Sequence, residues 1–386
     1  MLIPMKQILN GRILTPEGWL CGGSVITDGG KILEVSNNAL PVEGAERIDA
    51  QGGDIVPGGI ELHIHGGGGR DFMEGVEDAF RIAVDAHLKH GTTAIFPTLS
   101  SSSPAMIKAA VETCGKLMKE EGSPIMGLHL EGPYFNTAMA GAQMPEYITP
   151  PIPADYEPLL TESDVIKRWD AAPELPGTEE FGRFCTAHGC LPAIAHTKGE
   201  YEDAIRALKA GFTHLTHFTN AMSTMHKERE YKKVGIVEAG YEQEGFTVEV
   251  IADGIHVPAP LLSMIYKIKG VERMALITDA LAVAASDATE AFDPRVIIED
   301  GVCKLADRSA LAGSIATMDR LVRTAIQLAG IPAADAYRMT SETPARIMGI
   351  YDRKGSLQKG KDADIVIYDA QQNLRFVMQA GRVVIG

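Results

Sequence analysis

Long apolar runs, paired cysteines and an excess of basic residues are all missing from this 386-residue sequence. No stretch of about 18 apolar residues is present to span a membrane, and we expect no signal peptide, because no basic segment leads into an apolar run near the start. The 36 Lys and Arg residues are outnumbered by 51 Asp and Glu residues, which gives a formal charge of −15. This balance excludes general affinity for nucleic acid or anionic membranes, because both require basic surfaces.

The cysteines bear on the cellular compartment. They are odd in number and scattered through a chain long enough to fold without covalent cross-links: Cys21, Cys114, Cys185, Cys190 and Cys303. We therefore predict reduced thiols in a cytoplasmic protein. The acidic composition has a second consequence, since an anionic substrate would need a local positive site on such a protein.

Both ends of the chain contain short β-type segments separated by turns. Near the start, Gly- and Pro-containing turns interrupt the apolar runs, as at 28–30, and near the end the turn Ala380-Gly381 separates two such runs. The middle of the chain has a different pattern. We therefore predict one small β-sandwich domain built from residues 1–55 and 355–386.

The middle of the chain, residues 56–354, alternates apolar runs with amphipathic helical patterns, which predicts a parallel sheet covered by helices. Seven strands are expected at 59–64, 94–96, 125–130, 191–195, 214–216, 247–251 and 275–277. An eighth is expected near Leu311. This strand count and the length of the segment favour an α/β fold of the (β/α)8 TIM-barrel type over an open doubly wound sheet.

Polar side chains with catalytic potential directly follow several predicted strands, and in a parallel barrel these positions meet at the catalytic end. His63 and His65 end the first strand. Because residues i and i+2 of a strand share a face, both imidazoles can reach one metal ion. The other strand-end residues are Glu131, His196, His217 and Asp279. Each alone has an ordinary explanation, such as a helix N-cap for the Asp, but the six together favour metal ligation.

This ligand set contains nitrogen and carboxylate oxygen but no thiolate, which suits zinc, iron or manganese at a catalytic site with open positions. A metal ion in such a site makes water nucleophilic near neutral pH. Asp279 is then the expected general base and acid, since it can take the proton of the water and deliver it to a leaving amine.

Seven segments carry a family resemblance: HIHGG, GLHLEGP, IAHT, THFTNAM, ADGIHV, LITDA and GKDADIVIYD. In order and spacing they resemble the N-acetylglucosamine-6-phosphate deacetylases of the amidohydrolase superfamily, over essentially the whole chain. The HxH pair and the late Asp are superfamily features, whereas the Glu of HLEGP and the NAM segment are specific to this branch. The resemblance implies a barrel with a β-sandwich made from both chain ends. It also implies hydrolysis of N-acetyl-D-glucosamine 6-phosphate to glucosamine 6-phosphate and acetate.

The resemblance also implies roles for the strand-end residues. One metal ion would be held by Glu131, His196 and His217. His63 and His65 would hold a second ion; some members lack this pair and use one metal, so one or two ions per chain are expected. Asp279 would be the general base and acid.

The expected substrate is a small amino-sugar phosphate. The resemblance to the family is less complete at the residues that would bind it than at the strand-end residues. The backbone at Asn220 and Ala221 resembles the family's phosphate-binding turn, where N–H groups after a strand meet the anion. His256 in ADGIHV would bind the sugar or the phosphate. The residues that would line the sugar are Ala142, Leu311, Ala312 and Gly313.

Two positions depart from the family's pattern. Many members have a His on the acetyl carbonyl after HLEGP, whereas this sequence has Gln143, an amide that can donate to the carbonyl but cannot titrate. The family's HREPG segment offers its Arg to the phosphate of a neighbouring subunit. Here the segment reads HKEREYKK, in which Arg229 aligns best, and the competing interpretation is a solvated charged loop. An Arg229 that acts across a subunit boundary would make the protein a homodimer.

Three alternative functions stay open. The first keeps the chemistry and changes the sugar, to N-acetylgalactosamine 6-phosphate or an unphosphorylated amino sugar. The second is another amidohydrolase reaction, on a cyclic amide or an N-acyl amino acid, which the THFTNAM segment disfavours. The third is a non-catalytic sugar-phosphate sensor on a degenerate barrel, which the complete ligand set and Asp279 disfavour.

Overall fold

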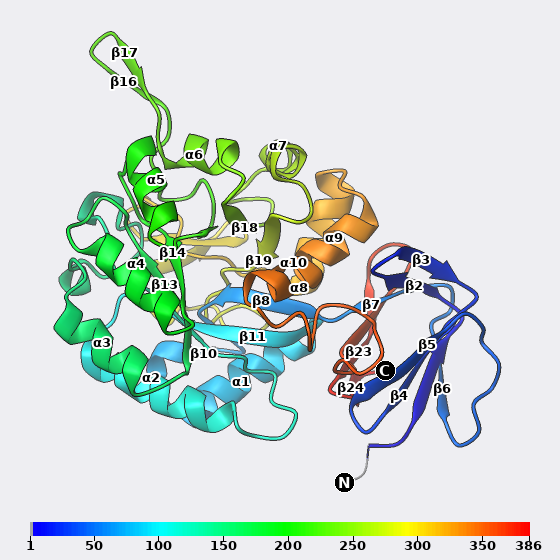
Figure 1. The fold of residues 1–386 in the computed structure, drawn as a ribbon. Helices are drawn as coiled ribbons and strands as arrows, with labels where there is room; N and C mark the ends of the chain where they lie inside the picture. The colour runs from blue at the N-terminus through cyan, green and yellow to red at the C-terminus, as the bar shows by residue number, and fades with distance from the viewer. Residues whose placement is uncertain (1–2) are drawn as a thin grey trace.

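A closed parallel barrel occupies the middle of the chain. The computed structural model describes residues 3–386, and eight of its strands form one sheet in which each strand pairs with the next along the chain (Figure 1). The strands are β8 (Gly59–Ile64), β11 (Thr92–Leu99), β12 (Leu128–Tyr134), β13 (Ile166–Ala171), β14 (Leu191–Ile194), β15 (His214–Leu215), β18 (Thr247–Ile251) and β19 (Met274–Ile277). The last strand returns to the first, where the N–H of Asp279 donates to the carbonyl of His63 at 3.0 Å. The predicted (β/α)8 barrel is confirmed.

One barrel strand differs from the prediction. The barrel strand that the sequence did not predict is β13. Leu311, where an eighth strand was expected, lies instead beside the hairpin of β20 (Val296–Glu299) and β21 (Val302–Leu305). The sequence of β13 is IKRWDA, and its alternate residues Arg168 and Asp170 are fully buried inside the barrel. A strand with charged residues on its interior face does not form an apolar run, so hydrophobic periodicity cannot detect it.

Helices follow most barrel strands and cover the outside of the sheet (Figure 1). The α-helices are α1 (Glu77–Leu88), α2 (Pro104–Leu117), α3 (Pro153–Thr161), α4 (Thr178–Ala187), α5 (Tyr201–Lys209), α6 (Ile236–Glu242), α7 (Ala259–Lys269), α8 (Met318–Arg323), α9 (Ala333–Thr340) and α10 (Glu342–Ile347). Shorter helical turns are η1 (Phe72–Glu74), η2 (Thr137–Met139), η3 (Pro145–Tyr147) and the π-helical η4 (Thr324–Leu328). In α2, for example, Ser103 caps the N-terminus by accepting the N–H of Met106, and Pro104 fits the first turn.

The two chain ends form two smaller sheets beside the barrel (Figure 1). One has the order β5-β4-β1-β6, and the other, β24-β23-β22-β7-β2-β3, pairs strands from both ends of the chain. Their bounds are β1 (Lys6–Leu9), β2 (Arg12–Thr15), β3 (Gly18–Cys21), β4 (Ser24–Asp28), β5 (Lys31–Ser36), β6 (Glu46–Asp49), β7 (Asp54–Pro57), β22 (Ile365–Tyr368), β23 (Leu374–Gln379) and β24 (Arg382–Ile385). Both sheets contribute to one buried hydrophobic cluster, which includes Ile8 and Ile365. The domain boundaries, 1–55 and 355–386 against 56–354, stay a prediction.

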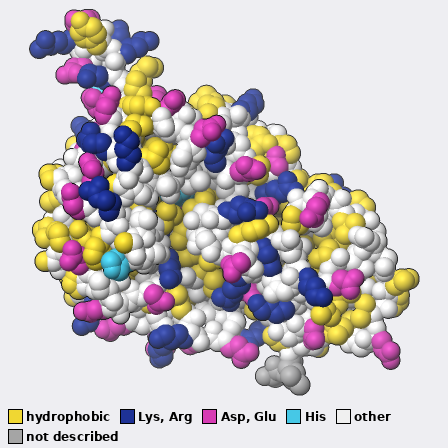
Figure 2. All heavy atoms as spheres, in the orientation of Figure 1, with side chains coloured by type: hydrophobic (Ala, Val, Ile, Leu, Met, Phe, Trp, Pro, Cys, Tyr) yellow, Lys and Arg dark blue, Asp and Glu magenta, His cyan; other side chains and the backbone are white. Residues whose placement is uncertain are grey.

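A hairpin of β16 (His226–Glu228) and β17 (Tyr231–Lys233) projects from the barrel beyond α5 and α6 (Figure 1). In the space-filling view, Lys and Arg side chains stand beside acidic ones on this hairpin (Figure 2). A further short hairpin joins β9 (Gly66–Gly67) and β10 (Arg70–Asp71) just after the first barrel strand. None of the helices formed by residues 3–386 combines the length and the apolar character needed to cross a bilayer.

Candidate active site

The six strand-end residues come together at the carboxyl ends of the barrel strands, and all six are buried. The residues that follow β14, β15 and β19 are His196, His217 and Asp279, and their φ angles are positive, at 45°, 30° and 49°. Such backbone conformations cost free energy for residues other than glycine, and they collect at functional sites. The fold therefore holds these three side chains in a constrained geometry.

Glu131, His196 and His217 form a first group of candidate metal ligands. Oε1 of Glu131 lies 3.0 Å from Nε2 of His196 and 3.1 Å from Nε2 of His217, and the two Nε2 atoms are 3.2 Å apart. The other ring nitrogens face backbone carbonyls. Nδ1 of His196 lies 2.7 Å from the oxygen of Met139, and Nδ1 of His217 lies 3.2 Å from the oxygen of Asn220.

These contacts fit a metal ion. A carbonyl oxygen only accepts hydrogen bonds, so in the neutral form of each imidazole Nδ1 carries the ring proton and Nε2 keeps a free lone pair. Three lone-pair atoms then face one another with no proton between them, an arrangement that a cation stabilises. Ligand atoms at about 2.0–2.1 Å from a tetrahedral ion lie roughly 3.3 Å from one another, close to the separations found in this group.

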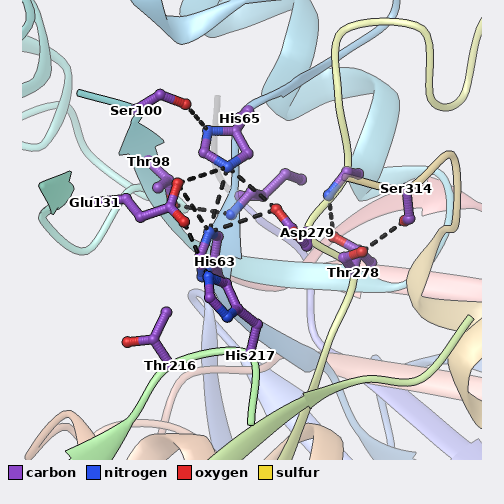
Figure 3. A network of polar contacts seen from close by, with 12 residues as sticks. His63, His65, Thr98, Ser100, Glu131, Thr216, His217, Thr278, Asp279 and Ser314 are labelled. Atoms are coloured by element: carbon purple, nitrogen blue, oxygen red, sulfur yellow. Dashed lines mark hydrogen bonds and ion pairs between the residues drawn. The ribbon is translucent and has the colours of Figure 1, made fainter. Parts of the chain in front are cut away.

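His63, His65 and Asp279 form a second group of candidate ligands. The Nε2 atoms of the two His residues are 3.3 Å apart, and Oδ1 of Asp279 lies 3.4 Å and 3.1 Å from them. Nδ1 of His63 donates to the carboxylate of Glu249 at 2.8 Å, which leaves its Nε2 free for a metal ion. Figure 3 shows both imidazoles turned toward the carboxylates of Asp279 and Glu131.

Glu131 joins the two groups. Its second oxygen, Oε2, lies 3.4 Å from Nε2 of His65 and 3.7 Å from Nε2 of His63. Burial opposes ionisation of Glu131 and of Asp279, but in the metal-free chain protonated neighbouring His side chains outweigh it and hold the pKa of each carboxyl below its usual range. Both carboxyls are therefore ionised at neutral pH, as a metal ligand and a general base must be.

A cavity of about 420 Å³ opens onto these groups, a size that suits a small-molecule ligand. The predicted site residues that line it are His65, Glu131, Ala142, Gln143, His196, His217, Asn220, Ala221, His256, Asp279, Leu311, Ala312 and Gly313. His63 lies beneath the cavity and is fully buried. Residues from distant parts of the chain thus meet around one cavity, and Arg229 is the predicted residue that lies elsewhere.

Gln143 lies against a candidate metal ligand. Its Oε1 accepts the backbone N–H of Ser101 at 2.7 Å, so its amide nitrogen faces the other way, where it donates to Oε2 of Glu131 at 2.7 Å. Only the second N–H of the amide is left for a substrate carbonyl. The structure therefore adds a contact with Glu131 to the role that the sequence suggested for Gln143.

The predicted anion-binding turn has one unused donor. The N–H of Asn220 donates to the carbonyl of His217, whereas the N–H of Ala221 makes no hydrogen bond within residues 3–386. In His256, which also lines the cavity, Nδ1 lies 2.8 Å from Oδ2 of Asp253. That contact fixes the imidazole and leaves its Nε2 for a ligand.

Arg229 occupies the tip of the projecting β16–β17 hairpin. It is exposed, has a positive φ of 55°, and forms no ion pair within residues 3–386. It does not line the cavity of its own chain. Its guanidinium is therefore presented outward, on a segment that stands clear of the barrel (Figure 1).

Sequence reasoning missed several charged residues near the site, among them Arg295 and Glu249. Arg295 is the only Lys or Arg among the cavity-lining residues, and it donates to the carbonyl of Ala142 at 2.9 Å and pairs with Asp293 at 2.6 Å. It follows a loop without a recognisable motif, so the sequence gives no signal for it. Glu249 was also missed, although a Glu within the apolar run of β18 is a usable signal of a buried polar role.

Comparisons with known proteins identify the family of this chain. The sequence model of the amidohydrolase family matches residues 55–385. N-acetylglucosamine-6-phosphate deacetylase from Haemophilus influenzae is 32% identical over 366 residues, which cover 94% of each chain. N-acetylgalactosamine-6-phosphate deacetylase from Escherichia coli O157:H7 is 30% identical over 385 residues, which cover 98% of this chain and 99% of that one.

A solved structure shows the same fold. It is a mutant N-acetyl-D-glucosamine-6-phosphate deacetylase from Mycobacterium smegmatis in complex with N-acetyl-D-glucosamine 6-phosphate. It matches with a TM-score of 0.91 and 28% identity, over 99% of this chain and 100% of that one. The family model, the near full-length similarity and the shared fold show that this chain belongs to the amidohydrolase family and, within it, to the N-acetylglucosamine-6-phosphate deacetylase family.

Proposed function

We propose that this chain removes the acetyl group of N-acetyl-D-glucosamine 6-phosphate by metal-dependent hydrolysis, giving glucosamine 6-phosphate and acetate in amino-sugar metabolism. One observation carries the chemistry: two groups of candidate ligands, joined by Glu131, converge at the base of a small-molecule cavity, and the ionised Asp279 of the second group lines that cavity. The substrate is supported by relatives that are named for this reaction and match along almost the whole chain.

The proposed cofactor is one or two divalent metal ions per chain. One ion would be held by Glu131, His196 and His217, and the other by His63, His65 and Asp279. Imidazole nitrogen and carboxylate oxygen suit zinc, iron or manganese. A bound ion polarises the acetyl carbonyl and makes water nucleophilic near neutral pH.

Asp279 performs the proton transfers in this proposal. Its Oδ1 faces His63 and His65, whereas its Oδ2 forms no hydrogen bond within residues 3–386. The carboxylate lines the cavity and starts ionised, so it can accept a proton from the attacking water. It then delivers that proton to the amine nitrogen as the bond to the acetyl group breaks.

The remaining cavity residues bind and orient the sugar phosphate. The unused N–H of Ala221 is the donor available to the phosphate, and the Nε2 of His256, whose Nδ1 pairs with Asp253, is left to accept from a sugar hydroxyl. The second amide N–H of Gln143 is the donor available to the acetyl carbonyl. Ala142 and the segment 311–313 pack against the sugar ring.

The proposal includes a cytoplasmic homodimer. Its support is the position of Arg229, at the tip of a hairpin that projects away from the cavity of its own chain. In a second copy of the chain, such a hairpin can reach the partner's cavity and bring a guanidinium to the phosphate. That contact would also supply the local positive charge that an acidic protein needs for an anionic substrate.

An acetate-release assay tests the function. The chain is stripped with a chelator, reloaded separately with zinc, iron(II) or manganese, and offered N-acetylglucosamine with and without the 6-phosphate. We expect activity to vanish with the metal, return on reloading, and be highest for the phosphorylated sugar. Metal-independent acetate release would refute the mechanism, and release only from an N-acyl amino acid would refute the substrate.

N-acetylgalactosamine 6-phosphate is a second candidate substrate, because a relative named for it covers nearly the whole chain at 30% identity. The same assay with that sugar ranks the two epimers by kcat/KM. Binding of a phosphorylated sugar without any acetate release, in the metal-loaded chain, would instead identify a sensor.

A further inference from the structure

A cluster of charged and polar residues fills the barrel interior directly beneath the two ligand groups. Arg168 and Asp170 come from β13, Glu249 from β18, His129 from β12 and His214 from β15, and all five are fully buried. Barrel interiors are usually filled with branched apolar side chains, and buried charges oppose folding unless they are paired. A charged cluster at this depth therefore calls for a functional explanation.

Glu249 is the centre of this cluster. Its Oε1 accepts from Nδ1 of His63 at 2.8 Å, from Nη2 of Arg168 at 2.8 Å and from the backbone N–H of His217 at 3.3 Å. Its Oε2 accepts from Nη1 of Arg168 and lies 3.3 Å from Nε2 of His214. One carboxylate thus contacts a residue of each candidate ligand group.

Arg168 holds Glu249 in this position. Its guanidinium contacts both oxygens of Glu249 and also pairs with Asp170 at 3.1 Å, while Asp170 lies 3.0 Å from Nε2 of His129. A two-armed guanidinium–carboxylate pair fixes the orientation of the carboxylate as well as its charge. Glu249 therefore cannot rotate away from His63 without breaking the pair.

The contact to His63 differs from the contacts of two other candidate ligands. Nδ1 of His196 and Nδ1 of His217 each face a backbone carbonyl, whereas Nδ1 of His63 faces the carboxylate of Glu249. A carboxylate on the far nitrogen fixes the tautomer of a metal-binding imidazole and strengthens it as a ligand. Of the three residues of the first ligand group, His217 alone forms a direct hydrogen bond with Glu249, through its backbone N–H.

We propose that Glu249, held by Arg168, is a positioning residue that sets the metal affinity of the second group, formed by His63, His65 and Asp279. The inference rests on the two-metal centre of the proposed function. Glu249 touches neither the cavity nor the reacting atoms, and it acts through the imidazole of His63. Its loss weakens binding at the second group far more than binding at the first.

Glu249→Gln tests this proposal, because it keeps the size of the side chain and removes its charge. Zn²⁺ is titrated into the metal-free full-length chain in competition with a chromophoric chelator, which gives separate affinities for the first and second equivalents. We expect the affinity for the second equivalent to fall by roughly 10- to 100-fold, and that for the first to change by less than about threefold.

Glu61→Gln is the matched control. Glu61 is equally buried and lies two residues from His63, but it accepts from the backbone N–H groups of His63 and Thr278 and forms no hydrogen bond with an imidazole within residues 3–386. We expect it to leave both affinities close to those of the wild type. An equal loss at the second equivalent in Glu61→Gln would overturn the proposal, because any substitution of a buried carboxyl near His63 would then have the same effect.

Two further measurements keep the proposal testable. Arg168→Lys retains the positive charge but loses one arm of the pair with Glu249. If Glu249→Gln does not fold, the Zn²⁺ affinities of Arg168→Lys at the two equivalents test the proposal instead. In chain labelled with ¹⁵N-histidine, the proton on Nδ1 of His63 should be seen in the wild type and lost or shifted in Glu249→Gln. Unchanged affinities, or equal losses at both equivalents, would overturn the proposal.

The outcome for the wild type separates this inference from the proposed function. A wild-type chain that binds only one equivalent of Zn²⁺ would refute the two-metal centre, and the positioning role would fall with it. A wild type that binds two equivalents, with an unaffected Glu249→Gln variant, would refute the positioning role alone.

Discussion

The amide nitrogen of Gln143 lies 2.7 Å from Oε2 of Glu131, the carboxylate oxygen that turns toward the His63–His65 pair. The carbonyl end of the same amide is fixed by the N–H of Ser101 at 2.7 Å. Gln143 therefore connects the cavity wall to the carboxylate shared by both ligand groups. Its amide orients Glu131 as well as facing the space where the acetyl group would bind.

Gln143→Leu should lower kcat/KM by roughly 10- to 100-fold, because Glu131 loses the donor that orients its Oε2. The variant should also lose about 1–3 kcal/mol of unfolding free energy, since the N–H of Ser101 is left without an acceptor. Steady-state kinetics and denaturant unfolding measure the two effects. Gln143→His, which keeps a donor next to Glu131, is the control and should retain more activity; a fully active Gln143→Leu would contradict both roles.

Asp279→Asn should lower kcat by about 10²- to 10⁴-fold, the usual contribution of a general acid–base. The amide cannot take up the proton of the attacking water. Metal at Glu131, His196 and His217 should be retained, because none of these residues is changed. Kinetics together with metal analysis of the purified variant separate loss of proton transfer from loss of metal, and substantial remaining turnover would rule out the proton-transfer role.

Arg229→Ala should raise KM for the phosphorylated sugar by roughly 10- to 100-fold and leave KM for the plain sugar unchanged, because a charge-assisted contact to the phosphate is lost. Lys227→Ala, on the same hairpin, is the matched control and should behave like the wild type.

Mixing Arg229→Ala with Asp279→Asn chains tests whether Arg229 acts in the partner subunit. A mixed dimer contains one cavity with an intact Asp279 and an intact Arg229 from the other chain. Activity at low substrate concentration should therefore recover on subunit exchange. A mixture no more active than the sum of its parts would place Arg229 outside the partner's cavity.

Arg295→Ala should raise KM for phosphorylated and plain sugars by a similar factor, roughly 10-fold, because Arg295 lies against Ala142 in the wall assigned to the sugar ring. Its charge is already paired with Asp293, which favours a contact with sugar hydroxyls. Kinetics on both sugars measure the effect. A selective loss for the phosphorylated sugar would move the phosphate to this side of the cavity.

Asp71 should make stability depend on pH. Burial raises the pKa of this cavity-lining carboxyl to about 6, from 3.8 in the unfolded chain, so between these values the folded state holds a proton that the unfolded state gives up. Its contribution to stability therefore falls as pH rises from 3.8 to 6. The Asp71→Asn variant has no carboxyl to titrate at this position. The difference between its unfolding free energy and that of the wild type should therefore increase from pH 4 to pH 7, by up to roughly 3 kcal/mol. Denaturant unfolding of both metal-free chains measures it, and a difference constant with pH would contradict the raised pKa.

The ligand types and the barrel were predictable because both depend on local patterns. His63 and His65 share a face of one strand, and Glu131, His196 and Asp279 each follow or end an apolar run. The carboxyl ends of the strands in a parallel barrel converge even when the strands are far apart in sequence. A motif at a strand end therefore predicts a residue of the site.

Strand β13, which was not predicted, shows where local sequence patterns fail to indicate a strand. β13 has no apolar run, because Arg168 and Asp170 face inward, and such a face is stable only when partners from other strands meet it. One of those partners, Glu249, lies 81 residues further along the chain. No local pattern encodes that pairing.

The sequence by itself determined the family, the barrel and the identity of the candidate metal ligands, because hydrophobic periodicity and short motifs are set by neighbouring residues. Only the tertiary structure decided that Gln143 contacts Glu131, that Glu249 supports His63, that Arg295 lines the cavity and that Arg229 stands apart from it. These relationships depend on how strands and loops distant in sequence pack together, and packing distances follow from the whole fold.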